Sequence, residues 1–120
     1  MGKIDARLAE LGISLPEVVR PVGAYVPAVR SGSYVYVSGQ LPLVGGKLVF
    51  VGKVGAEVTP EQGKEAARVS GINALAALAS VVGTLDKVKR IVKVTGFVAS
   101  APGFTAQPGV VNGASELFKD

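Results

Sequence analysis

The sequence is 120 residues long, a length that builds a single domain around one core. Its apolar fraction of 48% and charged fraction of 18% are those of a folded globular chain and exclude a disordered one. The chain has no His, Cys or Trp, which excludes a Ser-His-Asp triad, a Cys nucleophile and any His- or Cys-ligated metal site within it.

The first half of the chain predicts a short helix followed by three antiparallel strands. Apolar residues at helical spacing predict a helix over residues 3–11, which Gly12 is suited to end. Two prolines predict an extended connector over residues 14–22. Residues rich in β-branched and aromatic side chains predict strands at 25–29, 34–38 and 47–52, the first two joined by a turn at 31–33.

The second half predicts a long helix, a strand and a further helix. The sequence Thr-Pro-Glu-Gln at 59–62 has the pattern of a capping box, so we predict a helix over 60–82 that ends at Gly83 and packs one apolar face on a sheet. The β-rich residues 87–99 predict a central strand. Residues 108–118 predict a helix that begins near its proline.

This order of elements predicts an α+β fold, in which a mostly antiparallel sheet carries two packing helices and the short N-terminal helix precedes it. No linker or repeat divides the sequence, so residues 1–120 are expected to form a single domain. The apolar helix over 108–118 is expected to lead into another strand, because the sheet otherwise leaves its edges and apolar surface uncovered.

Composition also sets expectations about location and partners. A chain without cysteine forms no disulfide, and the charged residues 1–10 lack the apolar run of a signal peptide, so we expect a cytoplasmic protein without a membrane span. The net charge is +4, and the densest basic group consists of Lys87, Lys89, Arg90 and Lys93. Only one aromatic residue lies near this group, so it is interpreted as a solvated strand face, and a nucleic acid partner is not expected.

Three patterns in this order resemble the reactive intermediate deaminase family, also called the YjgF/Rid or endoribonuclease L-PSP family. Residues 23–29, GAYVPAV, are similar to the family's Gly-Pro-Tyr-x-x-Ala-Val segment, and residues 34–40, YVYVSGQ, to its strand that ends in Ser-Gly-Gln. The third pattern combines NALAAL at 73–78, VKVTGFV at 92–98, Phe104 and Val111-Asn112. The N-terminal helix and residues 99–104 resemble a longer subgroup of the family.

The resemblance implies a trimer-forming, chorismate-mutase-like fold with ligand sites in the clefts between subunits of a homotrimer. It implies the hydrolysis of reactive 2-imino and 2-enamino acids to 2-oxo acids and ammonia, with no cofactor. Such chemistry is compatible with a chain that lacks histidine, because water attacks a carbon that is already electrophilic. The site then needs only to hold the substrate carboxylate and to orient a water molecule.

The sequence departs from the family pattern near its C-terminal end. The family has a carboxylate-binding arginine in its penultimate strand and an acidic residue in its final strand, whereas this sequence has no arginine after Arg90. We therefore expect a domain shortened at the C-terminus with impaired deaminase activity, and the catalytic residues stay unassigned. A non-catalytic small-metabolite-binding or regulatory trimer is one alternative, and an endoribonuclease or translation inhibitor is another.

The resemblance implies Tyr25, Ser38, Gly39, Gln40 and Asn112 as substrate-binding residues. The hydroxyl of Tyr25 lines the cleft, or its ring packs in the core. The three residues after the second strand offer free backbone N–H groups to a carboxylate, or they form a tight turn that needs Gly39. Asn112 faces the cleft or holds a loop carbonyl, since burying its amide without a hydrogen bond is costly.

Four other polar residues are interpreted as structural. Asn73, on the long predicted helix, is expected to form a structural hydrogen bond. Arg30, beside the first hairpin turn, could replace the missing arginine, but a solvated residue is the favoured interpretation. Glu57 and Glu61 are interpreted as a solvated strand end and a first-turn helix acid.

Overall fold

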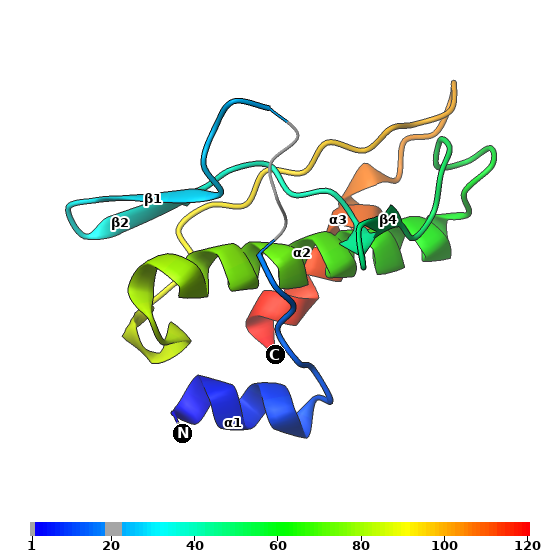
Figure 1. Ribbon diagram of the computed structural model, residues 1–120. Coiled ribbons are helices and arrows are strands. Elements are labelled where there is room, and N and C mark those ends of the chain that lie inside the picture. The colour runs from blue at the N-terminus through cyan, green and yellow to red at the C-terminus, as the bar shows by residue number, and fades with distance from the viewer. Residues whose placement is uncertain (1, 19–22) are drawn as a thin grey trace. The chain divides into compact units, whose positions relative to one another are not determined.

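The fold is given by a computed structural model that describes residues 2–18 and 23–120 (Figure 1). It divides into two compact units, and each is described by itself. The first unit comprises Met1–Gln40 and Asn73–Ile91, and the second comprises Leu41–Ile72 and Val92–Asp120. The described residues form α-helices and small antiparallel sheets, which confirms the predicted α+β class.

In the first unit, helix α1 spans Lys3–Glu10. Its N-terminus is capped by a residue far along the chain. The Asp86 carboxylate accepts a hydrogen bond of 2.7 Å from the backbone N–H of Ile4. Leu8 is the buried residue of this helix. Gly12 follows with a φ of 71°, a left-handed conformation that suits glycine, so the predicted helix and its end are confirmed.

The first unit also contains a hairpin of β1, Ala28–Ser31, and β2, Tyr34–Val37. The strands are antiparallel and pair Ala28 with Val37 and Ser31 with Tyr34. The predicted hairpin is therefore confirmed, although its first strand begins at Ala28 rather than at residue 25. The predicted connector is described only over residues 14–18, which are neither helix nor strand, and the rest of it lies outside the described residues.

Helix α2 spans Pro60–Val82 and begins as predicted. The Thr59 hydroxyl accepts a hydrogen bond of 3.1 Å from the N–H of Gln62, whose side-chain oxygen accepts one of 3.0 Å from the N–H of Thr59. This reciprocal pair is a capping box, and it satisfies two backbone donors that the helix leaves unpaired. Gly83, with a φ of 86°, follows the last helical residue.

Small residues, rather than the predicted branched ones, are the most deeply buried along α2. The buried positions are Gly63, Gly71, Asn73, Ala76 and Ala77, whereas Val69, Ile72, Leu75 and Leu78 are half-buried. By length and composition alone, α2 could cross a membrane, contrary to our expectation that the chain has no such segment. A core helix of a soluble protein meets the same criterion, so this is weak evidence for a membrane span.

In the second unit, α3 spans Gln107–Lys119 and has Pro108 in its first turn, as predicted. It lies very close to the beginning of α2, because a Cβ added to Gly113 would lie 1.9 Å from the carbonyl oxygen of Lys64. The Lys64 ammonium and the Glu116 carboxylate, 3.0 Å apart, join the two helices at their surface. Only glycine at position 113 allows this approach.

The core of the second unit consists of Val54, Val58 and Val110, with Phe50, Ala67, Val98 and Phe104 packed against it. A short hairpin of β3, Leu43–Val44, and β4, Lys47–Leu48, precedes it in the chain. The strand predicted over 47–52 is thus formed only at its start. After it, the chain turns through residues 55–57 instead of extending.

The strand predicted over 87–99 is wrong. Leu85–Lys87 form a 3-10 turn, and the residues after it include no strand before Ser100, which forms an isolated bridge with Val54 (Figure 1). No backbone N–H of residues 89–100 donates a backbone hydrogen bond to any other described residue. A strand exists only beside another strand, and the described chain places none here.

Candidate functional site

The chain that leaves β2 is held in place by Ser38. Its backbone N–H donates to the carbonyl of Pro27 at 2.9 Å, and its hydroxyl donates to the carbonyl of Val26 at 2.5 Å. Ser38 thereby fastens the end of the hairpin to the segment that enters it. The Ser38 N–H is therefore not free for a ligand, contrary to the expectation for that residue.

The next two residues present free backbone donors. Within the part of the chain that the structure describes, the N–H groups of Gly39 and Gln40 form no hydrogen bond. Gly39 is exposed, and its φ lies outside the left-handed range. Residues 38–40 do not form a turn, so the alternative of a tight turn that needs Gly39 is wrong.

Gln40 adds an unsatisfied acceptor beside these donors. Its side-chain nitrogen donates to the Ser38 carbonyl at 3.2 Å, which fixes the orientation of the amide. Its side-chain oxygen, Oε1, is buried and has no hydrogen-bond partner among the described residues. A buried carbonyl oxygen without a donor is uncommon in folded proteins.

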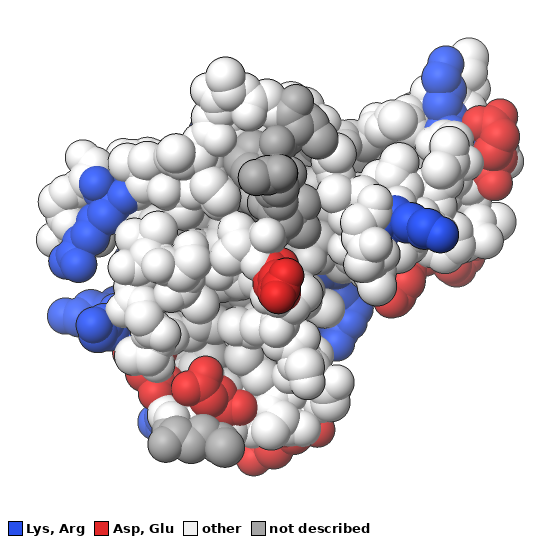
Figure 2. Space-filling model, viewed as in Figure 1, with Lys and Arg blue, Asp and Glu red and all other residues white. Residues whose placement is uncertain are grey.

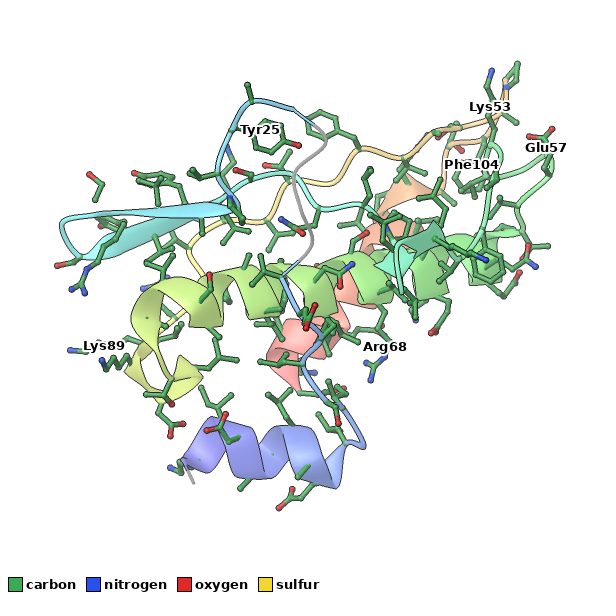
Figure 3. All side chains as sticks on the ribbon, in the orientation of Figure 1. Tyr25, Lys53, Glu57, Arg68, Lys89 and Phe104 are labelled. Atoms are coloured by element: carbon green, nitrogen blue, oxygen red, sulfur yellow. The ribbon has the colours of Figure 1, made fainter. Side chains whose placement is uncertain are left out.

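Tyr25 lies on the loop that leads into β1, where Figure 3 shows its side chain. The residue is 46% exposed, so the alternative of a core aromatic is wrong. Its ring lies against the chain two residues earlier, because a Cβ added to Gly23 would lie 2.9 Å from Tyr25 Cε1. The structure therefore presents an exposed tyrosine on the segment whose next two residues hold Ser38.

Asn112 lies on α3 in the second unit, whereas the other four predicted site residues lie in the first. It is exposed, and its side chain has no hydrogen bond with the described residues, so it does not hold a loop carbonyl. Asn73, in contrast, is only 1% exposed and has an interaction partner, which agrees with the structural role expected for it.

The charged alternatives have local structural roles. Arg30 is exposed, and its Nε donates to the carbonyl of Gly32 at 3.1 Å across the hairpin turn. Glu57 accepts a hydrogen bond of 2.9 Å from the backbone N–H of Lys53, and this bond lowers the pKa of the Glu57 carboxyl group (Figure 3). Glu61 lies in the first turn of α2, where the helix dipole favours an acid.

Neither a metal centre nor a basic surface stands out. The described residues contain no group of three or more acidic, His or Cys side chains that could hold a metal ion. On the face shown in Figure 2, the Lys and Arg side chains lie in separate places with acidic side chains near several of them. Such a distribution gives no extended track for a phosphate backbone on that face.

Two features of the site were not anticipated from the sequence. The first is that the carbonyls of Val26 and Pro27 accept hydrogen bonds from Ser38. The predicted hairpin could have indicated these bonds, because strand pairing brings the residues before the first strand next to those after the second. The second is that the side-chain oxygen of Gln40 has no hydrogen-bond partner among the described residues. No sequence pattern predicts this, because whether a glutamine amide finds a hydrogen-bond donor depends on residues that the fold brings next to it.

Comparison with known proteins finds relatives over nearly the whole chain. A family model described as "YjgF/chorismate mutase-like, putative endoribonuclease" matches residues 5–120. Protein TCP17 of Trypanosoma cruzi is 44% identical over 119 residues, which are 98% of this chain and 73% of TCP17.

Two solved structures have the same fold. A "putative endoribonuclease" from Shewanella oneidensis has a TM-score of 0.91 and 35% identity, over 94% of this chain and 75% of its own. The protein Atu1372 from Agrobacterium tumefaciens has a TM-score of 0.84 and 43% identity, over 95% of this chain and 69% of its own. The matches of sequence and of structure agree, and the chain belongs to the YjgF/chorismate mutase-like family.

Proposed function

We propose that this chain binds small 2-imino and 2-enamino acids at residues 38–40 and supports their hydrolysis to 2-oxo acids and ammonia. The observation that carries the proposal is the pair of unbonded N–H groups of Gly39 and Gln40, next to a serine that is fixed by two hydrogen bonds. Membership of the YjgF family supports it, because these residues stand in the segment that resembles the family's Ser-Gly-Gln.

The chemistry follows from the polarity of these groups. A free backbone N–H group binds an anion without a charged side chain, so the donors of Gly39 and Gln40 suit the carboxylate of the substrate. The carboxylate then fixes the neighbouring C=N carbon for attack by water. Water adds its oxygen to that carbon, the C–N bond breaks, and the nitrogen leaves as ammonia, so no electrons are exchanged and no cofactor takes part in the proposed reaction.

Two further side chains have roles in this proposal. Tyr25 is exposed and carries a hydroxyl that can orient the attacking water. Asn112, on α3 of the second unit, is included as a substrate-binding residue on the family resemblance alone. The family resemblance adds a homotrimer, a cytoplasmic location and a site completed at subunit boundaries, and we include these in the proposal.

The backbone assignment can be tested with a matched pair of substitutions at Gly39. Gly39→Ala keeps the N–H and is sterically tolerated, since a Cβ there meets nothing within 4 Å and φ is not left-handed. Gly39→Pro removes the donor, but proline also fixes φ at this position and restricts the backbone of Ser38, so the fold of this variant is checked together with its activity. An amino acid oxidase supplies the 2-imino acid, and semicarbazide traps what the protein has not hydrolysed.

We expect the wild type and Gly39→Ala to reduce trapping alike, and Gly39→Pro to lose roughly tenfold or more of that activity, because a hydrogen bond to a charged group is removed. Melting curves of both variants must match the wild type. Equal activity of the three proteins would show that the N–H of Gly39 does not bind substrate. If none is active, a rise in melting temperature with pyruvate separates a non-catalytic metabolite-binding protein from a chain without this site.

An endoribonuclease is the second candidate, favoured by the description of the matching family and by the name of the Shewanella relative. The absence of histidine removes the side chain that most often transfers protons in phosphodiester cleavage. This candidate is tested by incubating the same protein preparations with a labelled single-stranded RNA and measuring its cleavage. Cleavage that copurifies with the protein and is lost with a site variant would favour the nuclease.

A further inference from the structure

The sequence contains two asparagines, and they lie in opposite surroundings. Asn73 is followed by alanine, is only 1% exposed and has an interaction partner. Asn112 is followed by Gly113, is exposed, and its side chain has no hydrogen bond with the described residues. The side-chain amide of asparagine is chemically labile, and the residue that follows it determines how readily it reacts.

The reaction is an attack by the backbone on the asparagine side chain. The nitrogen of residue 113 forms a bond with Cγ of Asn112, the Cγ–Nδ2 bond breaks, and the amide nitrogen leaves as ammonia with the proton of the attacking N–H. Water then opens the resulting imide ring at either carbonyl carbon and leaves aspartate or isoaspartate. Glycine at position 113 favours this attack, because it has no Cβ to obstruct the ring and its backbone rotates freely.

The secondary structure opposes the attack. Both residues lie within α3, whose backbone pattern pairs the N–H of Gly113 with the carbonyl of residue 109. An imide ring fixes the ψ of residue 112 far from its helical value, so the ring cannot close until this turn of the helix opens. The rate of the reaction therefore depends on how often α3 opens.

Packing against α2 limits that opening. Gly113 is buried, and a Cβ added to it would lie 1.9 Å from the carbonyl oxygen of Lys64, so the backbone there has no room to rearrange in place. Leu117, one turn further along α3, is only 4% exposed. The turn around residue 112 can open only when α3 separates from the beginning of α2.

We propose that Asn112 is a site of spontaneous deamidation, which the folded α3 suppresses and its opening permits. The product has a carboxylate one helical turn before Glu116, where two like charges destabilise a helix. In isoaspartate the backbone itself is longer, which displaces Gly113 from its contact with Lys64. The modification is independent of the reaction proposed at residues 38–40, although it removes the amide that the family resemblance assigns to substrate binding.

The proposal can be tested by incubating the full 120-residue chain at mildly alkaline pH, which promotes loss of the proton from the attacking N–H. The water is enriched in heavy oxygen, so that each new carboxylate carries a label, and peptide mapping by mass spectrometry assigns the label to position 112 or 73. Chromatography against synthetic standards separates aspartate from isoaspartate. The native protein is compared with the same protein unfolded in urea.

We expect label at position 112, with isoaspartate among the products, and a rate roughly tenfold or more slower in the native protein than in urea. Asn73 should stay unlabelled in the native protein. Leu117→Ala, which weakens the packing of α3, should raise the native rate, and Lys119→Ala, at an exposed position of the same helix, should not. If Leu117→Ala does not fold, the wild type in urea below its unfolding transition replaces it, and its rate should rise with urea.

Three results would overturn the proposal. Equal rates in the native and the unfolded protein would show that α3 does not suppress the reaction. Labelling of Asn73 as fast as Asn112 in the native protein would show that neither the glycine nor the surroundings select the site. A native rate that neither Leu117→Ala nor low urea raises would show that the reaction does not depend on the opening of α3.

Discussion

Helices α2 and α3 and the segment at residues 92–98 are all apolar, yet only the helices have the secondary structure that their sequence predicts. A helix pairs its backbone groups within itself, so its start and end depend on residues a few positions away. A strand depends on a neighbour that can come from anywhere. The difference shows that local sequence is sufficient to predict a helix, whereas a strand-like sequence forms a strand only when a partner strand lies beside it.

The largest effect is expected from Leu117→Ala, which removes a side chain of α3 that is only 4% exposed. A cavity beside α2 should lower the free energy of unfolding by roughly 2–5 kcal/mol. Urea unfolding followed by circular dichroism measures it. Lys119→Ala, at an exposed position of the same helix, is the control, and a similar small change in both would mean that the α2–α3 contact is not part of the core.

Gly113→Ala should be the next most damaging change. Its Cβ would lie 1.9 Å from the carbonyl oxygen of Lys64, and because that atom is backbone, the two helices must move apart. We expect a loss of about 1–3 kcal/mol in the same unfolding measurement. Gly109→Ala adds a methyl group on the same helix where nothing lies within 4 Å, and it should leave stability unchanged or slightly raised.

Thr59→Ala tests whether the beginning of α2 is set locally. The substitution removes the hydroxyl that accepts from the N–H of Gln62, which should cost about 0.5–2 kcal/mol. Thr59→Ser keeps an acceptor and should recover most of the loss. A melting temperature that is the same in all three proteins would indicate that packing, and not the cap, positions the first turn.

The smallest effect is expected in residues 92–98. Val92→Thr replaces a side chain that is 67% exposed, so stability should change by no more than about 0.5 kcal/mol. Hydrogen exchange of the dilute protein should be fast at these amides and slow in the middle of α2. Slow exchange there in the absence of any partner would contradict the contrast with the helices.

The candidate site was predictable in part. The Ser-Gly-Gln pattern at 38–40 located the end of a strand, and two of its three N–H groups are free as expected. The sequence could not show that Ser38 uses its own N–H, since Val26 and Pro27 meet it only when the hairpin forms. It likewise could not show that Tyr25 is exposed, because an aromatic residue near a strand fits a core equally well.

By itself, the sequence determined the limits of α1, α2 and α3, the turn of the first hairpin and the family, because each rests on neighbouring residues or on a pattern in fixed order. Tertiary structure alone decided that residues 87–99 form no strand, that Gly113 rather than a branched residue sets the approach of α3 to α2, and that Gln40 Oε1 is left without a donor. The reason is the same in all three cases. A strand partner, a close backbone contact and a buried hydrogen bond each require atoms from a distant part of the chain, and local sequence carries no record of whether those atoms arrive.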